Sequence, residues 1–417
     1  MSATAIDRAR EHPYGWVIVS VATISLALGF GAGGVVSVLM KPLEQEFGWF
    51  RADISMAYTA YSLGAAIGGL FWGALSDRIG ARPIALIGTL GMSAGLAALK
   101  WQHSLWQLDI LFFLIGSVGF ACLFTPLTAL TGLWFNARKG LAIGIATAGG
   151  ALGQGVVPYF GRLLITELGW RDAMLALGAA FLVILIPLMF LLRPAPIVAQ
   201  PAGHSAARDT NLWNVPHAVA LPWLGLAALF CCICMTAPQV HLIPLGIDIG
   251  CSPQTAAGLL LTVMVTAVFG RLFFGWLADR IGGLRSYFLA SLAQTSVVFF
   301  FTQTNSIAVL YQLSVLYGFG FAGVMTCLLI CSREAAPVRL SGFAMSAVAT
   351  IGWLGMGLGS YQAGYFYDIS ANYRLSFGNA AAAGVVNLLI VAALFWYRAR
   401  AHRTGGGSSA QTELKAV

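Results

Sequence analysis

Apolar runs of roughly 20 residues recur from one end of the chain to the other, and each could cross about 30 Å of hydrocarbon as a helix. Twelve such runs can be counted, with centres near residues 27, 63, 90, 119, 151, 182, 232, 265, 294, 319, 354 and 386. Only 9% of the 417 residues are charged, whereas soluble domains carry about 25%. The sequence therefore predicts an all-α polytopic membrane protein with twelve transmembrane helices.

The first apolar run, from Tyr14 to about Met40, is longer than the apolar region of a cleaved signal peptide, so we expect it to be retained as a span. Basic residues then predict the orientation, because they accumulate in cytoplasmic loops. Sixteen of the 23 Lys and Arg fall on the side of the N-terminus and six on the opposite side, which leaves Arg271 inside an apolar run. We expect both termini in the cytoplasm and the spans in the cell inner (plasma) membrane.

A polar stretch rich in proline, RPAPIVAQPAGHSAARDTNLWNVP (193–216), separates the sixth run from the seventh. Such a composition is typical of a flexible linker, here between two six-helix halves. The expected parts are a cytoplasmic N-terminus (1–13), an N-terminal six-helix bundle (14–192), a cytoplasmic linker (193–218), a C-terminal six-helix bundle (219–398) and a cytoplasmic tail (399–417).

One loop sequence occurs twice. GALSDRIGAR (73–82) follows the second run, and GWLADRIGGLR (275–285) follows the eighth, 202 residues later. Parallel repeats of this kind occur in one transporter architecture, and both loops resemble the signature loop of the major facilitator superfamily. The resemblance implies two pseudo-symmetric bundles that rock around a central cavity. Four charged residues of these loops are expected to close the cytoplasmic side by pairing with neighbouring helix ends: Asp77, Arg78, Asp279 and Arg280.

Three further segments are similar to monocarboxylate transporters and their bacterial oxalate/formate-type relatives. They are YGWVIV (14–19), WFNARKGLAIGIATAGGALG (134–153) and HLIPLGIDIG (241–250). The resemblance extends over essentially the whole chain, and it implies a secondary transporter of small organic anions.

Arg271 is the residue that the sequence singles out for substrate binding. It lies eight residues before Asp279, or roughly 12 Å inside the cytoplasmic boundary on a helix. A cation at this depth costs at least about 2.5 kcal/mol and usually faces a polar cavity or a substrate path. A guanidinium grips a carboxylate through two parallel hydrogen bonds, and the monocarboxylate family carries its substrate-binding arginine at this position. The alternatives are a side chain that reaches the headgroups, or a structural ion pair.

The chain departs from its relatives in three places that bear on substrate and coupling. Ala267 stands where animal monocarboxylate transporters often carry an aspartate, span one lacks their lysine, and span eleven lacks the lysine of oxalate exchangers. One central cation suits one carboxylate, which favours a monocarboxylate. A proton would then travel with the bound substrate, while exchange and facilitated diffusion remain open.

Four weaker candidates complete the expected site: Tyr61, Thr326, Gln239 and His241. Tyr61 and Thr326 would shape the pocket, or instead pack and bond their own helix. Gln239 and His241, near the outer end of span seven, would gate or line the path, although a lone histidine is more often structural.

Other chemistry is not expected. Cys231, Cys232 and Cys234 lie in an apolar span without a histidine pair, so they read as packing residues rather than zinc ligands. GFGAGG (29–34) and GFGFAG (318–323) match the dinucleotide pattern but follow no strand. We expect no cofactor, metal, catalytic residue or nucleic-acid partner, and a monomer.

The predicted function is transport of a lactate- or pyruvate-like monocarboxylate by alternating access, coupled to protons. The alternatives are an oxalate/formate-type anion antiporter and a carrier of a bulkier organic acid. A carboxylate receptor is disfavoured because the tail has no signalling domain, and a drug or cation exporter because no acidic residue lies deep in a span.

Overall fold

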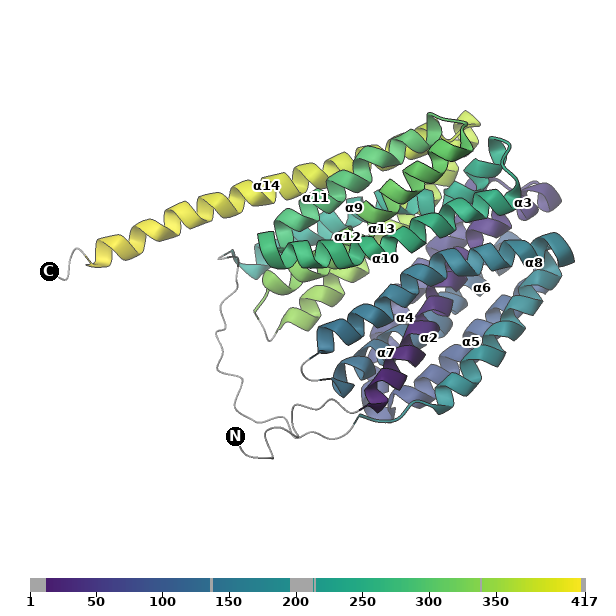
Figure 1. Cartoon of the computed structure of the whole chain (residues 1–417), viewed down its shortest axis with the longest axis horizontal. Helices are drawn as coiled ribbons and strands as arrows, with labels where there is room; N and C mark the ends of the chain where they lie inside the picture. Colours follow the sequence, from purple (N-terminus) through teal and green to yellow (C-terminus); the bar gives the residue numbers. More distant parts are fainter. Residues whose placement is uncertain (1–12, 136–137, 196–212, 214, 338–339, 414–417) are drawn as a thin grey trace.

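The computed structural model describes residues 13–135, 138–195, 213, 215–337 and 340–413, and every regular element in these residues is a helix (Figure 1). The N-terminal half contains α2 (Tyr14–Gly34), α3 (Val36–Phe47), α4 (Arg51–Ile79), α5 (Ala81–Ala98), α6 (Leu105–Leu114), a π-helical turn (Ile115–Phe120), α7 (Ala121–Trp134) and α8 (Lys139–Phe190). The C-terminal half contains α9 (His217–Asp248), α10 (Pro253–Ile281), α11 (Gly283–Val298), α12 (Ile307–Glu334), α13 (Ser341–Ser370) and α14 (Arg374–Glu413). Short 3₁₀ turns follow α5 (Leu99–Trp101) and α11 (Phe299–Thr302).

The described residues contain eleven helical segments that are long and apolar enough to cross a membrane. One of them, Gly140–Phe190, has 51 residues, about 77 Å of helix and more than two membrane thicknesses. Its backbone leaves the helical region at Gly169 (φ 76°, ψ 160°), where Figure 1 shows α8 turning back on itself. Counted on either side of this turn, the spans number twelve, which confirms the predicted all-α fold with twelve transmembrane helices.

The repeated loops adopt the same backbone conformation. Gly80 between α4 and α5 has φ 88°, and Gly282 between α10 and α11 has φ 90°. Residues with a side chain rarely adopt such angles, so both copies require glycine at this position. We call the end of the bundle that holds Gly80 and Gly282 the terminal side, because α2 begins there. The opposite end, with the turns at Gly48 and Gly169, is the distal side.

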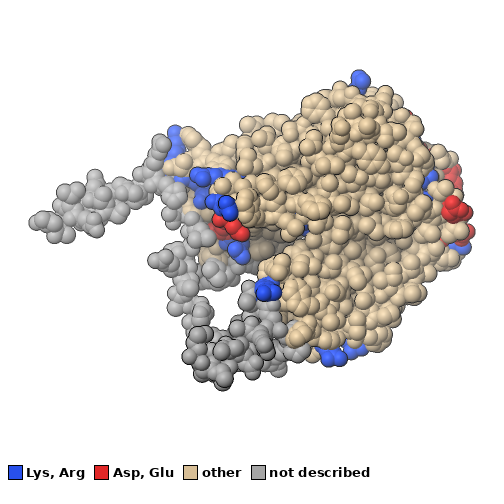
Figure 2. Space-filling model, in the orientation of Figure 1, with Lys and Arg blue, Asp and Glu red and all other residues tan. Residues whose placement is uncertain are grey.

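Charged side chains avoid the middle of the molecule. The broad central surface in Figure 2 shows almost no Lys, Arg, Asp or Glu. Many large apolar side chains are exposed instead, among them Leu70, Val183 and Leu389, with 64%, 72% and 64% of their surface accessible. Because water would not tolerate so much apolar surface, the central band lies in the bilayer, and the chain is a multi-pass membrane protein.

The two halves meet along α4 and α13, along α8 and α10, and between α3 and α9. Helix α8 ends at Phe190 and α9 begins at His217, so residues 217–218 of the predicted linker (193–218) belong to α9. Most of the linker (196–212 and 214) is outside the described residues, as is the segment 1–12. From the predicted tail, residues 399–413 continue α14 as helix.

Candidate functional site: Arg271 between the two halves

Arg271 lies on α10 where this helix faces α8 of the other half. Its Nη1 donates to the backbone carbonyl of Thr147 over 3.0 Å. Its Nε is buried without a hydrogen-bond partner, and no ion pair among the described residues includes it. Arg271 stands ten residues before the end of α10 at Ile281, about 15 Å inside the terminal side. A guanidinium has five N–H donors, so most of its capacity is available to an anion.

A cluster of five aromatic residues forms an apolar wall in the middle of the bundle. Trp353 of α13 packs against three rings of the N-terminal half: Phe30, Tyr61 and Phe120, at centroid distances of 6.1, 6.3 and 5.5 Å. Phe124 stacks on Phe120 at 5.2 Å and completes this aromatic cluster. Phe30, Phe124 and Trp353 remain partly exposed, so their faces can contact a ligand between the halves.

Helix α8 connects the guanidinium to this cluster. Thr147 accepts the hydrogen bond from Arg271, and three residues later Gly150 packs under Phe30, where an added Cβ would lie 2.8 Å from a ring carbon. Three residues of helix advance about 4.5 Å. The cation and the aromatic wall therefore occupy neighbouring turns, and together they offer one carboxylate-binding group beside an apolar surface.

Of the two residues predicted to shape the pocket, Tyr61 belongs to the aromatic cluster and Thr326 does not. Tyr61 is 1% exposed, belongs to the aromatic cluster and spends its hydroxyl on the carbonyl of Gly29 at 3.0 Å. Thr326 lies on α12 beside Gly275 of α10 and donates to the carbonyl of Ala322 in its own helix at 3.3 Å. Tyr61 thus contributes a ring rather than a hydroxyl, and the Thr326 hydroxyl is engaged within α12.

On the distal side an ion-pair network joins the halves. Arg51, at the start of α4, is 1% exposed and holds Asp248 of α9 through contacts of 2.5 and 3.0 Å. It also contacts Glu44 at 3.1 Å and the Tyr373 hydroxyl at 2.7 Å, and it lies over the ring of Tyr367 at 3.7 Å. Lys41 reaches Asp248 at 2.6 Å. Two cations and two carboxylates therefore compensate one another, as burial requires.

The same end of α4 is capped from the other half. Asp368 of α13 accepts the backbone N–H groups of Arg51 at 3.0 Å and Ala52 at 2.7 Å. These N–H groups have no partner inside the helix, and the helix dipole favours a carboxylate there. We refer to Lys41, Glu44, Arg51, Asp248 and Asp368 as the distal lock.

His241, predicted as a gate or path residue, lies directly beneath the distal lock and is fully buried. Its Nε2 is 3.1 Å from the Ser360 carbonyl, which can only accept, so this nitrogen carries the hydrogen. Its Nδ1 then accepts from the Tyr373 hydroxyl at 3.2 Å. Burial raises the pKa of Tyr373 above its ordinary value, which keeps this hydroxyl protonated. The His241 Nε2 also lies 3.2 Å from the hydroxyl of Ser55 on α4, and this contact joins His241 to the N-terminal half.

Gln239, two residues earlier on α9, makes a second contact with the N-terminal half. Its Oε1 accepts from the Tyr58 hydroxyl of α4 at 3.3 Å. Gln239 and His241 are thus brought together with the distal lock and not with Arg271.

The residues predicted to close the cytoplasmic side are exposed on the terminal side: Asp77, Arg78, Asp279 and Arg280. None of the ion pairs among the described residues includes them, and Arg280 lies over the ring of Trp276 at 4.5 Å. Within the described part of the chain, the polar side-chain contacts between the halves come from residues 40–59, with one addition at Arg271. The two halves are therefore joined by polar contacts mainly on the distal side.

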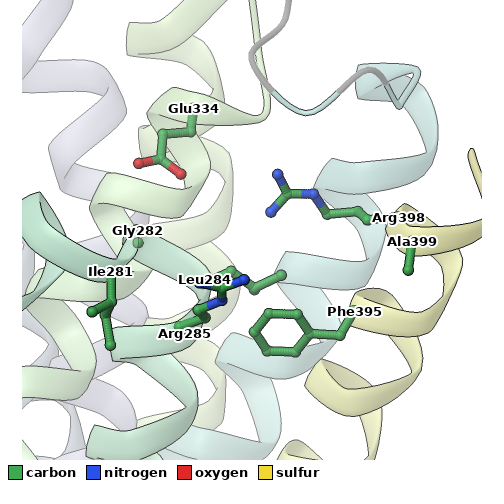
Figure 3. Close-up of a pocket in the computed structure, with 9 residues that line it drawn as sticks. Ile281, Gly282, Leu284, Arg285, Glu334, Phe395, Arg398 and Ala399 are labelled. Atoms are coloured by element: carbon green, nitrogen blue, oxygen red, sulfur yellow. The ribbon is translucent and has the colours of Figure 1, made fainter. Parts of the chain in front are cut away.

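A cavity of about 310 Å³ lies on the terminal side of the C-terminal half, away from Arg271. In Figure 3 the guanidinium of Arg398 points toward the carboxylate of Glu334, above Arg285 and Phe395. Glu334 also accepts from the indole N–H of Trp213 at 3.0 Å. All these residues belong to the C-terminal half or to the end of the linker, so this cavity does not lie between the halves.

Sequence reasoning missed two of the residues that shape this arrangement. In the sequence, Arg51 contributed only to the count of positive charges on one side of the membrane. Trp353 was one of many apolar residues in a glycine-rich span. No local pattern distinguishes them, because Arg51 meets Asp248 across 197 residues of sequence.

The family model of the Major Facilitator Superfamily matches residues 21–360 and 242–416. The chain is 28% identical to monocarboxylate transporter 13 of Rattus norvegicus over 386 residues, covering 87% of this chain and 85% of the relative. It is 24% identical to the uncharacterized MFS-type transporter YcxA of Bacillus subtilis over 352 residues, covering 81% and 84%.

Two solved structures share the fold. One is a bacterial homologue of the human lysosomal transporter Spinster in an inward-facing, unoccupied conformation, with a TM-score of 0.72, 17% identity and coverage of 94% of this chain and 98% of that chain. The other is a D-xylose–proton symporter, with a TM-score of 0.72, 17% identity and coverage of 91% and 97%. With its twelve spans in two repeated halves and a family match along most of its length, the chain belongs to the Major Facilitator Superfamily of membrane transporters.

Proposed function

We propose that the protein is a secondary transporter that moves a small monocarboxylate, of the size of lactate or pyruvate, by alternating access. One observation carries this proposal: Arg271 lies inside the membrane between the halves, with one hydrogen bond to a backbone carbonyl and no carboxylate partner among the described residues. A cation held there without a protein counterion favours an anionic ligand.

The chemistry beside Arg271 supports one carboxylate with a short apolar body. The guanidinium binds the carboxylate, and the aromatic cluster one turn away contacts the rest of the molecule. A second cation, which a dicarboxylate would need, is absent from α10 within one helical turn of Arg271 and from α8 within one turn of Thr147. The relatives named monocarboxylate transporters support the same substrate class.

In this proposal the terminal side is cytoplasmic, and the protein works as a monomer in the cell inner membrane. Opening of the distal lock exposes Arg271 to the outside, and its closure exposes Arg271 to the cytoplasm. In this proposal a proton crosses together with the substrate carboxylate, so one transport cycle moves no net charge across the membrane.

Uptake of labelled lactate and pyruvate into proteoliposomes tests the proposal, with and without an inward proton gradient. We expect wild-type uptake that the gradient accelerates, loss of uptake in Arg271→Gln, and little change in Arg333→Gln, an exposed arginine at the end of α12. Equal uptake by Arg271→Gln and wild type would reject the role of Arg271. Transport of oxalate, formate or bulkier acids without lactate or pyruvate would reject the substrate and favour one of the alternative carriers.

A further inference from the structure

A second arginine lies inside the membrane on the interface between the halves. Arg162 belongs to α8 and stands seven residues before the turn at Gly169, about 10 Å inside the distal side. By sequence it counts as a loop charge, but the structure places it within the span and partly buried. Its Nε is buried without a hydrogen-bond partner, and no side-chain contact to a carboxylate is found for it among the described residues.

The packing of α8 on α10 shows which way Arg162 faces. Gly155 lies directly on α10, where an added Cβ would be 2.9 Å from both the Leu261 Cα and the Met264 Cβ. Arg162 follows Gly155 by seven residues, or nearly two full turns, so both lie on the same face of α8. Arg162 therefore faces α10, along the line of contact that we call the α8–α10 seam (Figure 1).

Gln254 occupies the corresponding position on α10. It precedes Leu261 by seven residues and so shares its α8-facing side, again two turns toward the distal side. Both polar atoms of its amide are buried without a hydrogen-bond partner. Nearby, the Tyr311 hydroxyl lies against Gly258 and donates to the carbonyl of Thr255 at 3.4 Å. The distal end of the seam thus holds a cation and an amide whose hydrogen-bonding capacity the protein does not use.

The side chains of Arg162 and Arg271 point toward each other along the seam, which suggests that they bind the same ligand in turn. Side chains on a helix tilt toward its N-terminus. The N-terminus of α8 is on the terminal side and that of α10 is on the distal side, so Arg162 and Arg271 both lean toward the middle of the seam. Arg162 stands about 10 Å on one side of the Gly155–Leu261 contact, and Arg271 about 15 Å on the other.

We propose that Arg162, with Gln254, forms a second anion-binding position that receives the substrate carboxylate on the distal side before it reaches Arg271. This inference rests on the proposed function. When the distal lock opens, α8 and α10 separate at this end and uncover both side chains to water. The arriving carboxylate accepts from the guanidinium and the amide, and it moves down the seam to Arg271 as the halves rock. The bound anion is the same small carboxylate, so the two positions act in sequence.

Transport from one side at a time tests the inference, with labelled lactate in proteoliposomes of known orientation. We expect Arg162→Gln to raise the KM for entry from the distal side about tenfold, the loss of one hydrogen bond to a charge. The maximal rate of entry and the KM from the terminal side should change less than twofold. Because the ratio of maximal rate to KM must be equal in the two directions when no gradient is present, the maximal rate of exit to the distal side should fall about tenfold. Gln254→Leu should act in the same direction more weakly, and Arg162→Lys should restore most of the affinity because the charge is kept.

Arg374→Gln is the matched control, since Arg374 is an exposed arginine on the distal side outside the seam. An unchanged KM for entry from the distal side in Arg162→Gln would overturn the inference. Equal changes of KM from both sides would also overturn it, as would a loss of the maximal rate of entry that Arg162→Lys does not restore. If the wild type moves no carboxylate at all, the proposed function fails and this inference fails with it. If the wild type transports lactate and Arg162→Gln behaves like Arg374→Gln, only this inference is rejected.

Discussion

Arg51 of α4 grips Asp248 of α9 with both Nη atoms, at 2.5 and 3.0 Å, and so fastens the N-terminal half to the C-terminal half at the distal side. Arg51 is 1% exposed, so removing its partner leaves a charge that water cannot reach. A transporter that alternates must break this pair once in every cycle, and the surrounding contacts decide how often it does so.

Asp248→Asn should therefore shift the protein toward a distal-open state. Removing one partner of a buried pair costs about 3–5 kcal/mol, and the side chain of Asp248 is 22% exposed, so we expect roughly 1–3 kcal/mol here. This corresponds to about a 5- to 150-fold change in the ratio of closed to open protein. Spin labels at Gln45→Cys and Arg374→Cys, one in each half, would report the change as a longer distance; an unchanged distance distribution would show that the pair does not hold the halves.

Asp368→Ala should weaken the same closure by a smaller amount. The carboxylate caps the first turn of α4 through two backbone N–H groups, and loss of a cap costs about 0.5–2 kcal/mol. Asp368→Asn keeps one acceptor oxygen and should retain part of the effect. The same pair of spin labels would measure it, and an Asp368→Ala shift that exceeds that of Asp248→Asn would contradict this ranking.

Gly155→Ala should impair transport, because the α8–α10 seam has no room for a methyl group. Its Cβ would lie 2.9 Å from the Leu261 Cα, closer than such atoms approach in proteins. Gly144→Ala, on the same helix, is the control, since nothing lies within 4 Å of an added Cβ there. We expect lower uptake for Gly155→Ala at equal expression and near wild-type uptake for Gly144→Ala. Equal uptake rates for the two variants would mean that a methyl group at Gly155 does not hinder the closing of the seam.

Trp353→Ala should widen the pocket and change its preference. Trp353 fills the space between three rings of the other half, and replacing a large aromatic residue leaves a cavity. Competition of aromatic and branched acids with lactate uptake would measure the result, with Trp353→Phe as the conservative control. We expect stronger inhibition by bulky acids in Trp353→Ala only. No change in the order of inhibitors would place the substrate away from the aromatic cluster.

Much of the fold could be predicted because it depends on local sequence. Twelve apolar runs gave the spans, and the repeated Asp-Arg-Ile-Gly at 77–80 and 279–282 gave the two halves, whose glycines share a φ near 90°. Arg271 stood out because a charge in an apolar run is costly wherever it faces. The partners across the halves could not be predicted. Glycine-rich spans have no polar stripe to show which side faces the other half. The sequence could therefore not predict the partners of Gln239 and His241, which the structure shows beside the distal lock.

Binding of lactate and of its neutral amide, lactamide, to wild type and Arg271→Gln tests the central claim most directly. If Arg271 holds the carboxylate, lactate should bind wild type at least tenfold more tightly than lactamide. A tenfold difference in Kd corresponds to about 1.4 kcal/mol, the free energy typical of a hydrogen bond to a charged group. Arg271→Gln should then bind lactate no better than wild type binds lactamide. Equal lactate affinity in wild type and Arg271→Gln would contradict the account, because Arg271 would then have a structural role only.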